Sequence, residues 1–279
     1  MKTHSMKQRI AGKIARKRRV LRAFGVCCLL ALAPACAGSG GEEPGQRDTA
    51  VGASCPDGST PKAECPPAAE KPDPAALIDD LEDADAFVTT SSGRSGGWWT
   101  AGDDTAGASV VPPVGLAAPE AIVGGRCDSK LAMRVTGQGF LDWGSLLGVD
   151  LAYGTRADGS AGSLPYDASA YSGVEFWARI GDTSTDRVRF AVSDVNSEPD
   201  GGVCVDDSTS TDRCFDTFGM YLVGLTPEWR HYRIPFTSLL QRNFGHPAAA
   251  AATSALYSVQ FNFDPGSVFD FWVDDAAFY

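Results

Sequence analysis

The chain has 279 residues, with 35 Asp and Glu against 24 Lys and Arg and a formal net charge of −11. Residues 1–35 hold nine of the basic residues and no acid, so the rest of the chain carries 15 basic and 35 acidic residues. Such an acidic surface argues against nucleic acid as a partner, because phosphates are bound through Lys and Arg.

The first 35 residues have the pattern of an export signal. A basic segment is followed by the apolar run AFGVCCLLALAPA, which is too short to cross a hydrocarbon core of roughly 30 Å as a helix. The run ends in LALAPAC, which resembles a bacterial lipobox with Cys36 as the lipidated residue, although Ala33 stands where Leu is usual. The prediction is an outer-membrane or cell-surface lipoprotein that meets the membrane only through its anchor. The alternative is an ordinary cleaved signal peptide and a secreted protein.

Residues 36–76 are predicted to be a disordered linker. They are rich in Pro, Gly, Ser and Glu and nearly lack large apolar residues, so they cannot bury a core. This places the folded domain in residues 77–279, a length sufficient for one hydrophobic core.

Five cysteines follow Cys36, and in an exported protein such cysteines are expected to pair. Cys204 and Cys214 enclose nine residues and are predicted to form a disulfide, and Cys55 and Cys65 have the same spacing. Cys127 has no assigned partner.

The folded domain has the pattern of an all-β protein. Apolar and polar residues alternate most clearly over residues 171–181, 186–195, 230–236, 258–264 and 268–278, with Gly- and Pro-rich turns between them. Residues 247–257 are the best helical candidate and are equally consistent with a loop. Without alternating helices, the expected fold is an antiparallel β-sandwich of the jelly-roll type.

Alternation also predicts a polar and aromatic sheet face. Three strands share an apolar face, and their other face carries Trp177, Arg189, Gln260 and Asn262. Sugars offer hydroxyl groups to polar side chains and C–H faces to aromatic rings, so this face suits a glycan. A merely solvated outer face is the alternative, and the sequence does not show which sheet each strand joins.

Several segments together resemble a known family. They are IDDLED, MRVTGQGFLDWGSLLGVDL, YDASAYSGVEFWARIG, TPEWRHYRIPFTSLL and FDFWVDDAAFY. The chain is similar to the family-11-type carbohydrate-binding modules and to the complex I intermediate-associated family, both galactose-binding-like jelly rolls. The resemblance implies sugar binding on the concave sheet, by Trp177, Arg189, Gln260 and Asn262, or at loops and edges, with the candidates Trp98, Trp99, Trp143 and Tyr153. Packing in the core is the competing role of each Trp.

The resemblance also implies a structural calcium ion between the first and last strands. The matching stretches are IDDLED and WVDD, which give Glu82 and Asp274 as ligands and Asp80 and Asp275 as substitutes. Calcium prefers several carboxylate and carbonyl oxygens, which acids from two chain ends supply. The alternative is that one Asp of each pair is exposed and the other caps backbone N–H groups.

The chain lacks the HExxH motif and a phosphate-binding loop. The prediction is therefore a non-catalytic, monomeric, lipid-anchored envelope protein that binds a polysaccharide or oligosaccharide. A structural or adhesive envelope protein with protein partners is the first alternative. A glycan hydrolase or lyase, with Glu175 paired to Asp264 or Asp194, is the second.

Overall fold

The structure is a computed structural model that describes residues 72–279. The predicted signal, most of the predicted linker, Cys36, Cys55 and Cys65 lie outside this range. Within it, no helix is both long enough and apolar enough to span a membrane.

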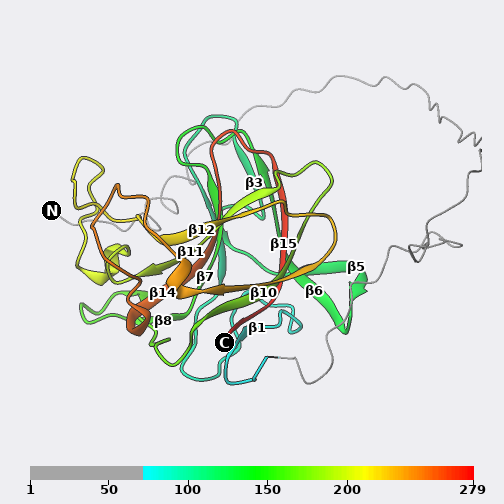
Figure 1. The fold of residues 1–279 in the computed structure, drawn as a ribbon, viewed down its shortest axis with the longest axis horizontal. Coiled ribbons are helices and arrows are strands. Elements are labelled where there is room, and N and C mark those ends of the chain that lie inside the picture. Colours follow the sequence, from blue (N-terminus) through cyan, green and yellow to red (C-terminus); the bar gives the residue numbers. More distant parts are fainter. Residues whose placement is uncertain (1–71) are drawn as a thin grey trace, which may run out of the picture. The chain divides into compact units, whose positions relative to one another are not determined.

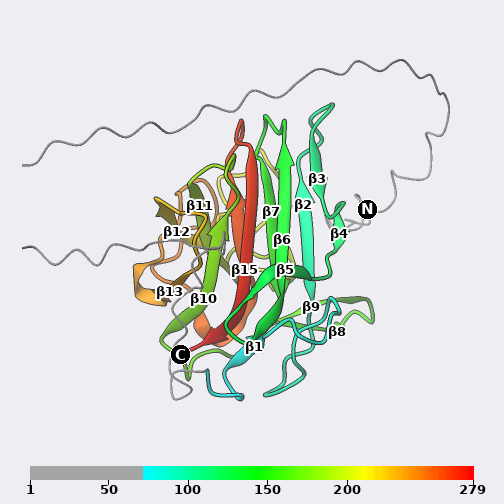
Figure 2. The ribbon, with the colours of Figure 1, turned by 90° about the vertical axis from the view of Figure 1, so that its right-hand side faces the viewer.

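Two antiparallel sheets and one hairpin make up the domain (Figure 1). The seven-stranded sheet has the order β13-β10-β15-β6-β3, with β1 beside β15 and β5 beside β6. Its strands are β1 (Leu77–Asp79), β3 (Ser109–Val111), β5 (Glu120–Arg126), β6 (Ser129–Gln138), β10 (Gly173–Ile180), β13 (Arg230–Pro235) and β15 (Phe269–Phe278). The central strands β10, β15 and β6 lie side by side in Figure 2.

The six-stranded sheet has the order β12-β11-β14-β7-β2-β4. Its strands are β2 (Trp98–Gly102), β4 (Gly115–Leu116), β7 (Ser145–Asp150), β11 (Arg187–Asp194), β12 (Phe218–Val223) and β14 (Leu256–Phe263). Strands β8 (Ala152–Thr155) and β9 (Ala161–Leu164) form the separate hairpin. The helical segments are the short 3-10 turns η2 (Pro199–Gly201), η3 (Phe236–Ser238) and η4 (Thr253–Ala255).

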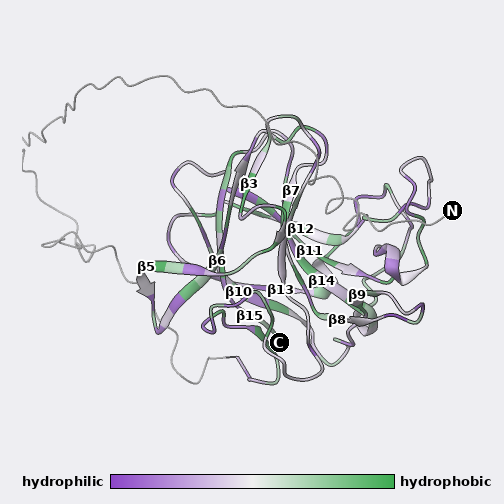
Figure 3. Cartoon of the chain, turned by 180° about the vertical axis from the view of Figure 1, so that it is seen from behind, coloured by the Kyte–Doolittle hydropathy of each residue, from purple (hydrophilic) through white to green (hydrophobic). Residues whose placement is uncertain are grey.

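The core fills the space between the two sheets. Apolar and polar residues alternate along strands such as β6 (Figure 3), and the apolar set turns inward. Phe263 of one sheet stacks on Phe269 of the other with ring centroids 4.0 Å apart, and Phe261 meets Phe271 at 5.0 Å. The predicted antiparallel β-sandwich is confirmed. The helical candidate 247–257 is a loop that ends in η4 and enters β14.

Strict alternation fails at one point of the last strand. Glu175 pairs with Ala277 and Trp177 with Asp274, so β15 carries one extra residue, a β-bulge, at this point. Asp275 lies in the bulge with φ +48°. The bulge shifts the alternation, so that Val273 before it and Phe278 after it both reach the core.

The predicted single polar face is wrong in one respect. Trp177 lies on β10 of the seven-stranded sheet, whereas Arg189, Gln260 and Asn262 lie on β11 and β14 of the six-stranded sheet. Outward side chains of two packed sheets point away from each other, so Trp177 is on the opposite side of the sandwich. Alternation separates inside from outside, but it does not assign a strand to a sheet.

Candidate functional site

The outer face of the six-stranded sheet gathers most of the predicted ligand-binding residues. Paired residues on adjacent strands form a row across the sheet: Gly219, Ala191, Gln260, Gly148 and Trp99. A second row, two residues along, contains Tyr221, Arg189, Asn262 and Leu146. We call these two rows the platform. The structure thus places Trp99, predicted as a loop or edge candidate, on the same sheet face as Arg189, Gln260 and Asn262.

Trp99 lies flat at one end of the platform. A Cβ atom built on Gly148 would come within 2.7 Å of Trp99 Cζ2 and 2.8 Å of Cε2, so the indole covers the bare backbone of Gly148. Trp99 Nε1 donates to Asp150 Oδ1 at 2.9 Å, and Ser163 Oγ donates to Asp150 Oδ2 at 2.6 Å. The ring is half-buried. This fixes a partly solvent-open aromatic surface of the kind on which sugar rings stack.

Arg189 lies at the other end in a similar way. A Cβ atom on Gly219 would lie 2.7 Å from Arg189 Cζ, so the guanidinium packs over this glycine. It donates to Thr217 Oγ1 at 3.0 Å, to the Thr217 carbonyl at 2.7 Å and to the Leu240 carbonyl at 3.2 Å. Burial lowers the pKa of Arg189 to about 10, which leaves it cationic at neutral pH.

Polar groups occupy the floor between and beside these planar groups. Gln260 Nε2 donates to Ser258 Oγ at 2.9 Å, and Asn262 Nδ2 donates to the Arg189 carbonyl at 3.3 Å. Next to them the Tyr221 hydroxyl donates to Asp264 Oδ1 at 3.0 Å. Amide, hydroxyl and carboxylate groups together provide both donors and acceptors, as recognition of hydroxyl groups requires.

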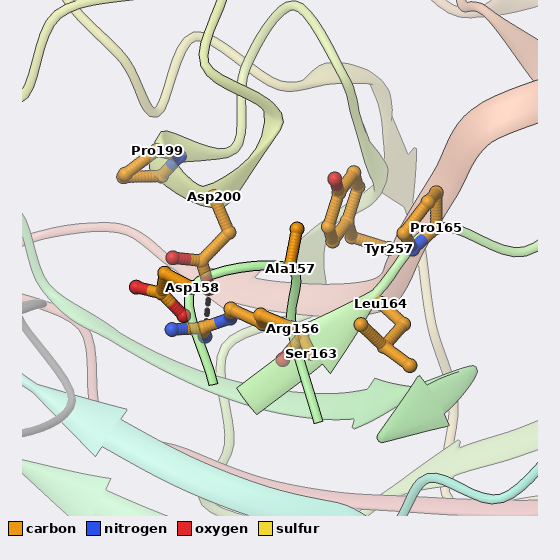
Figure 4. Close-up of a pocket in the computed structure, with 9 residues that line it drawn as sticks. All are labelled: Arg156, Ala157, Asp158, Ser163, Leu164, Pro165, Pro199, Asp200 and Tyr257. Carbon is orange, nitrogen blue, oxygen red and sulfur yellow. Dashed lines mark hydrogen bonds and ion pairs between the residues drawn. The ribbon is translucent and has the colours of Figure 1, made fainter. Parts of the chain in front are cut away.

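Two loops form a wall along one side of the platform. The β8–β9 hairpin is tied to the face by Ser163, and the loop carrying η2 is tied to it by the Ser193 Oγ bond to Glu198 Oε2, 3.1 Å long. An ion pair between Arg156 and Asp200 joins the two loops. A cavity of about 400 Å³ lies there, lined by residues of both loops and by Tyr257 (Figure 4). Tyr153, predicted as an edge candidate, lies on β8 opposite Ser163 and is half-exposed.

Two other edge candidates have backbone or core roles. Trp98 is fully buried in the core, where Nε1 donates to Asp79 Oδ2 at 2.7 Å, so its assignment to a binding edge is wrong. Trp143 lies in a turn, and its own backbone N–H donates to Asp103 Oδ2 at 3.1 Å.

The predicted disulfide between Cys204 and Cys214 is confirmed. Thr217, which accepts a hydrogen bond from Arg189, lies three residues after Cys214. The disulfide therefore closes the loop that leads directly to Thr217. Cys127, for which the sequence offered no partner, is also disulfide-bonded.

Trp177 belongs to an aromatic and cationic ladder on the opposite side of the sandwich. There Arg126 lies 4.8 Å from the Trp177 ring centroid and 5.7 Å from that of Trp229. Arginine and tryptophan side chains continue to alternate in cation–π contacts through Arg179, Trp272 and Arg134. Cation–π contacts of this kind order a surface. The Trp177 ring is thereby packed into a stabilising layer rather than into the platform.

The predicted calcium ligands come together around an arginine. Asp274 is fully buried, and its Oδ2 accepts from Arg126 Nε at 2.9 Å and from Ser129 Oγ at 2.7 Å. Glu82 Oε1 accepts from the same Ser129 Oγ at 3.1 Å and from the backbone N–H of Lys130 and Leu131 at 2.7 and 2.9 Å. Burial raises the pKa of Asp274 to about 6 against the opposing effect of Arg126.

These side chains do not fit a calcium site. The positive charge that faces Asp274 is the Arg126 guanidinium, which also pairs with Asp275. Asp80 Oδ1 accepts the Glu82 N–H at 3.3 Å, as in the capping alternative. Within residues 72–279, no group of three or more His, Cys, Asp or Glu side chains is placed to hold a metal ion. Calcium binding therefore remains a prediction from the family resemblance. The geometry of these side chains does not favour it.

The acid pair considered for a glycosidase is not assembled. Glu175 lies on β10 beside Arg233 and His231, whereas Asp194 and Asp264 belong to β11 and to the end of β14 in the other sheet. Asp194 is buried and accepts from the Asn196, Ser197 and Ala252 groups around it. Neither combination places two carboxyl groups across one site.

Several site residues were missed by the sequence reasoning: Asp150, Ser163, Tyr221, Arg156, Asp200 and Arg126. The glycines inside strands were an available signal, because a glycine there marks a close approach of another group. Gly148, Gly219 and Gly162 each lie beneath a planar side chain, namely Trp99, Arg189 and Arg156. Which side chain covers each glycine depends on contacts that the sequence does not show.

The fold and the platform define an antiparallel β-sandwich with a polar-aromatic outer sheet face.

Comparison with solved structures finds carbohydrate-binding modules, the class that the sequence resembles. A family 11 module from Clostridium thermocellum, in complex with a β-1,3-1,4-mixed-linked tetrasaccharide, is 16% identical, with a TM-score of 0.43 over 73% of this chain and 94% of the module. A family 30 module from a cellulosomal cellulase of Clostridium thermocellum is 14% identical, with a TM-score of 0.42 over 73% of this chain and 96% of the module. No family model and no curated protein matches the sequence. The fold assignment rests on the strand pairing itself.

Proposed function

We propose that the domain of residues 77–279 is a non-catalytic polysaccharide-binding domain and that the platform is its binding surface. The observation that carries this proposal is the Trp99 indole, which lies over Gly148 and is held by Asp150 beside Gln260 and Asn262. An aromatic surface next to paired donors and acceptors matches the two faces of a sugar ring. The pre-formed hydrogen bonds mean that little side-chain entropy is lost on binding.

The test compares two tryptophans on opposite sides of the sandwich. Trp99→Ala and Trp177→Ala both remove a half-buried indole, but only the first lies in the platform. In affinity gels containing a panel of soluble polysaccharides, the unmodified protein is expected to be retarded on at least one. Trp99→Ala should lose that retardation, and Trp177→Ala should keep it. Equal mobility of all three proteins on every polysaccharide would overturn the proposal.

We further propose that the domain is carried to the cell envelope and anchored through lipid on Cys36. The support is the basic segment, the short apolar run and the LALAPAC sequence at the start of the chain. Metabolic labelling with a radioactive fatty acid is expected to mark the unmodified chain and not Cys36→Ser. Equal labelling of both would contradict the anchor without affecting the platform.

A further inference from the structure

The platform and the cavity beside it differ in shape and in surroundings. Across the strands, the row from Gly219 to Trp99 stays open to a ligand, with the Arg189 guanidinium lying over Gly219 and the Trp99 indole over Gly148. Along the strands, the next row is covered: Ser193, Ser258 and Asp150 are all buried beneath the hairpin and the η2 loop. A long chain on the platform is therefore expected to run across the strands and past the wall.

The cavity opens within that wall, close to Trp99. The two are linked through one carboxylate, because Asp150 accepts both from Trp99 Nε1 and from Ser163 Oγ, and Ser163 lines the cavity. With about 400 Å³, the cavity is of a size that holds one small ligand. The Arg156–Asp200 ion pair forms part of its lining.

The chemistry of the cavity suits a neutral polyhydroxyl group. Arg156 packs over Gly162 and offers N–H donors, and Asp158 and Asp200 offer carboxylate acceptors. The Tyr257 ring adds an aromatic wall (Figure 4). Two carboxylates against one guanidinium disfavour an acidic ligand, whereas hydroxyl groups satisfy donors and acceptors alike.

We propose that this cavity receives a single neutral sugar branch of a polysaccharide whose main chain lies on the platform, so that the domain prefers branched over linear glycans. This inference rests on the proposed function and adds the class of ligand. It assigns main-chain contacts to Trp99, Gln260 and Asn262 and branch contacts to Arg156, Asp158 and Asp200.

The experiment uses polysaccharides with and without their branches. Galactomannan, arabinoxylan and xyloglucan are each compared with a sample trimmed by a debranching glycosidase, and affinities are measured by titration calorimetry. At least one branched polymer is expected to bind about tenfold more tightly than its trimmed form, the effect of one or two hydrogen bonds. Ala157→Trp fills the cavity from an exposed turn position without removing the ion pair. It should abolish this preference and leave binding of the trimmed polymer unchanged.

Asp200→Asn provides a second variant that keeps the shape of the side chain and should reduce the preference in the same direction. Equal affinities for branched and trimmed polymers, or a preference that survives Ala157→Trp, would overturn the branch proposal alone. Absence of binding to every polymer would overturn the proposed function as well.

Discussion

Arg126 Nη2 lies 2.9 Å from Asp274 Oδ2, and both side chains are almost completely buried, with 2% and 0% of their surface exposed. The pair links the β5–β6 hairpin to the last strand, between residues 148 positions apart in sequence. It occupies the place where the family resemblance implies calcium. Removing one member of a buried ion pair is strongly destabilising, because the charge that remains is buried without a partner and without access to solvent.

Removing Arg126 should therefore destabilise the domain strongly. Arg126→Met keeps most of the side-chain volume and leaves Asp274 without its charge partner, with an expected loss of about 3–5 kcal/mol in the free energy of unfolding. Urea denaturation measures the loss. Arg233→Met, which removes an exposed arginine from the same sheet, should cost less than about 1 kcal/mol. Adding Asp274→Asn to Arg126→Met should recover part of the loss, and equal stability of the two single variants would refute this role of Arg126.

Calcium should not stabilise the unmodified domain. Asp274 and Asp275 already face Arg126, and Glu82 is occupied by Ser129 and backbone N–H groups, so binding a cation would require breaking these bonds. The melting temperature is expected to be the same in millimolar calcium and in chelator. A rise of several degrees with calcium, lost in Asp274→Asn, would show that the predicted ligand set is real and that Arg126 moves away.

Stability should increase as the pH falls from about 7 toward 5. Burial raises the pKa of Asp79 from 3.8 to about 7 and that of Asp274 to about 6. In this window the folded state holds protons that the unfolded state releases, so protonation favours folding and its contribution is lost as the pH rises. Asp103, whose pKa is lowered to about 2, and Glu82, whose pKa is also lowered, act in the opposite sense below about pH 5, because in both groups hydrogen bonds to the carboxylate outweigh burial.

Urea denaturation across this pH range checks the effect. Asp79→Asn cannot titrate and keeps an oxygen that accepts from Trp98 Nε1. In this variant the free energy of unfolding should change less with pH at the upper end of the range. An unchanged slope in this variant would mean that Asp79 is not the group responsible.

Gly148 should be needed for binding more than for folding. In Gly148→Ala the new methyl group would lie 2.7 Å from Trp99 Cζ2, so the indole must lift from the sheet and weaken its bond to Asp150. Affinity for the polysaccharide retained by the unmodified protein should fall by about tenfold, the equivalent of 1.4 kcal/mol. Calorimetric titration and thermal melting together separate the two effects. Unchanged affinity would show that the position of the Trp99 indole against the sheet does not affect binding.

Much of the fold could be predicted because strand alternation is a local property of the chain. The strands around Val174, Phe190 and Phe261 were recognisable, and so was the split between their inward and outward residues. The Cys204–Cys214 disulfide was predictable because its loop is short. The bulge at Asp275 was not, because it depends on the register with Glu175 and Trp177 of a strand about 100 positions away.

The binding surface was only partly predictable for the same reason. The sequence by itself determined that Trp177, Arg189, Gln260 and Asn262 are polar or aromatic positions in strand-forming segments, and it indicated Trp99 only as a loop or edge candidate. Only the tertiary structure decided that Trp177 faces away from the others, since sheet membership follows from long-range pairing and packing rather than from alternation. It also decided that Arg126 meets Asp274, because burying a carboxylate demands a partner and the chain supplied a guanidinium from a distant hairpin.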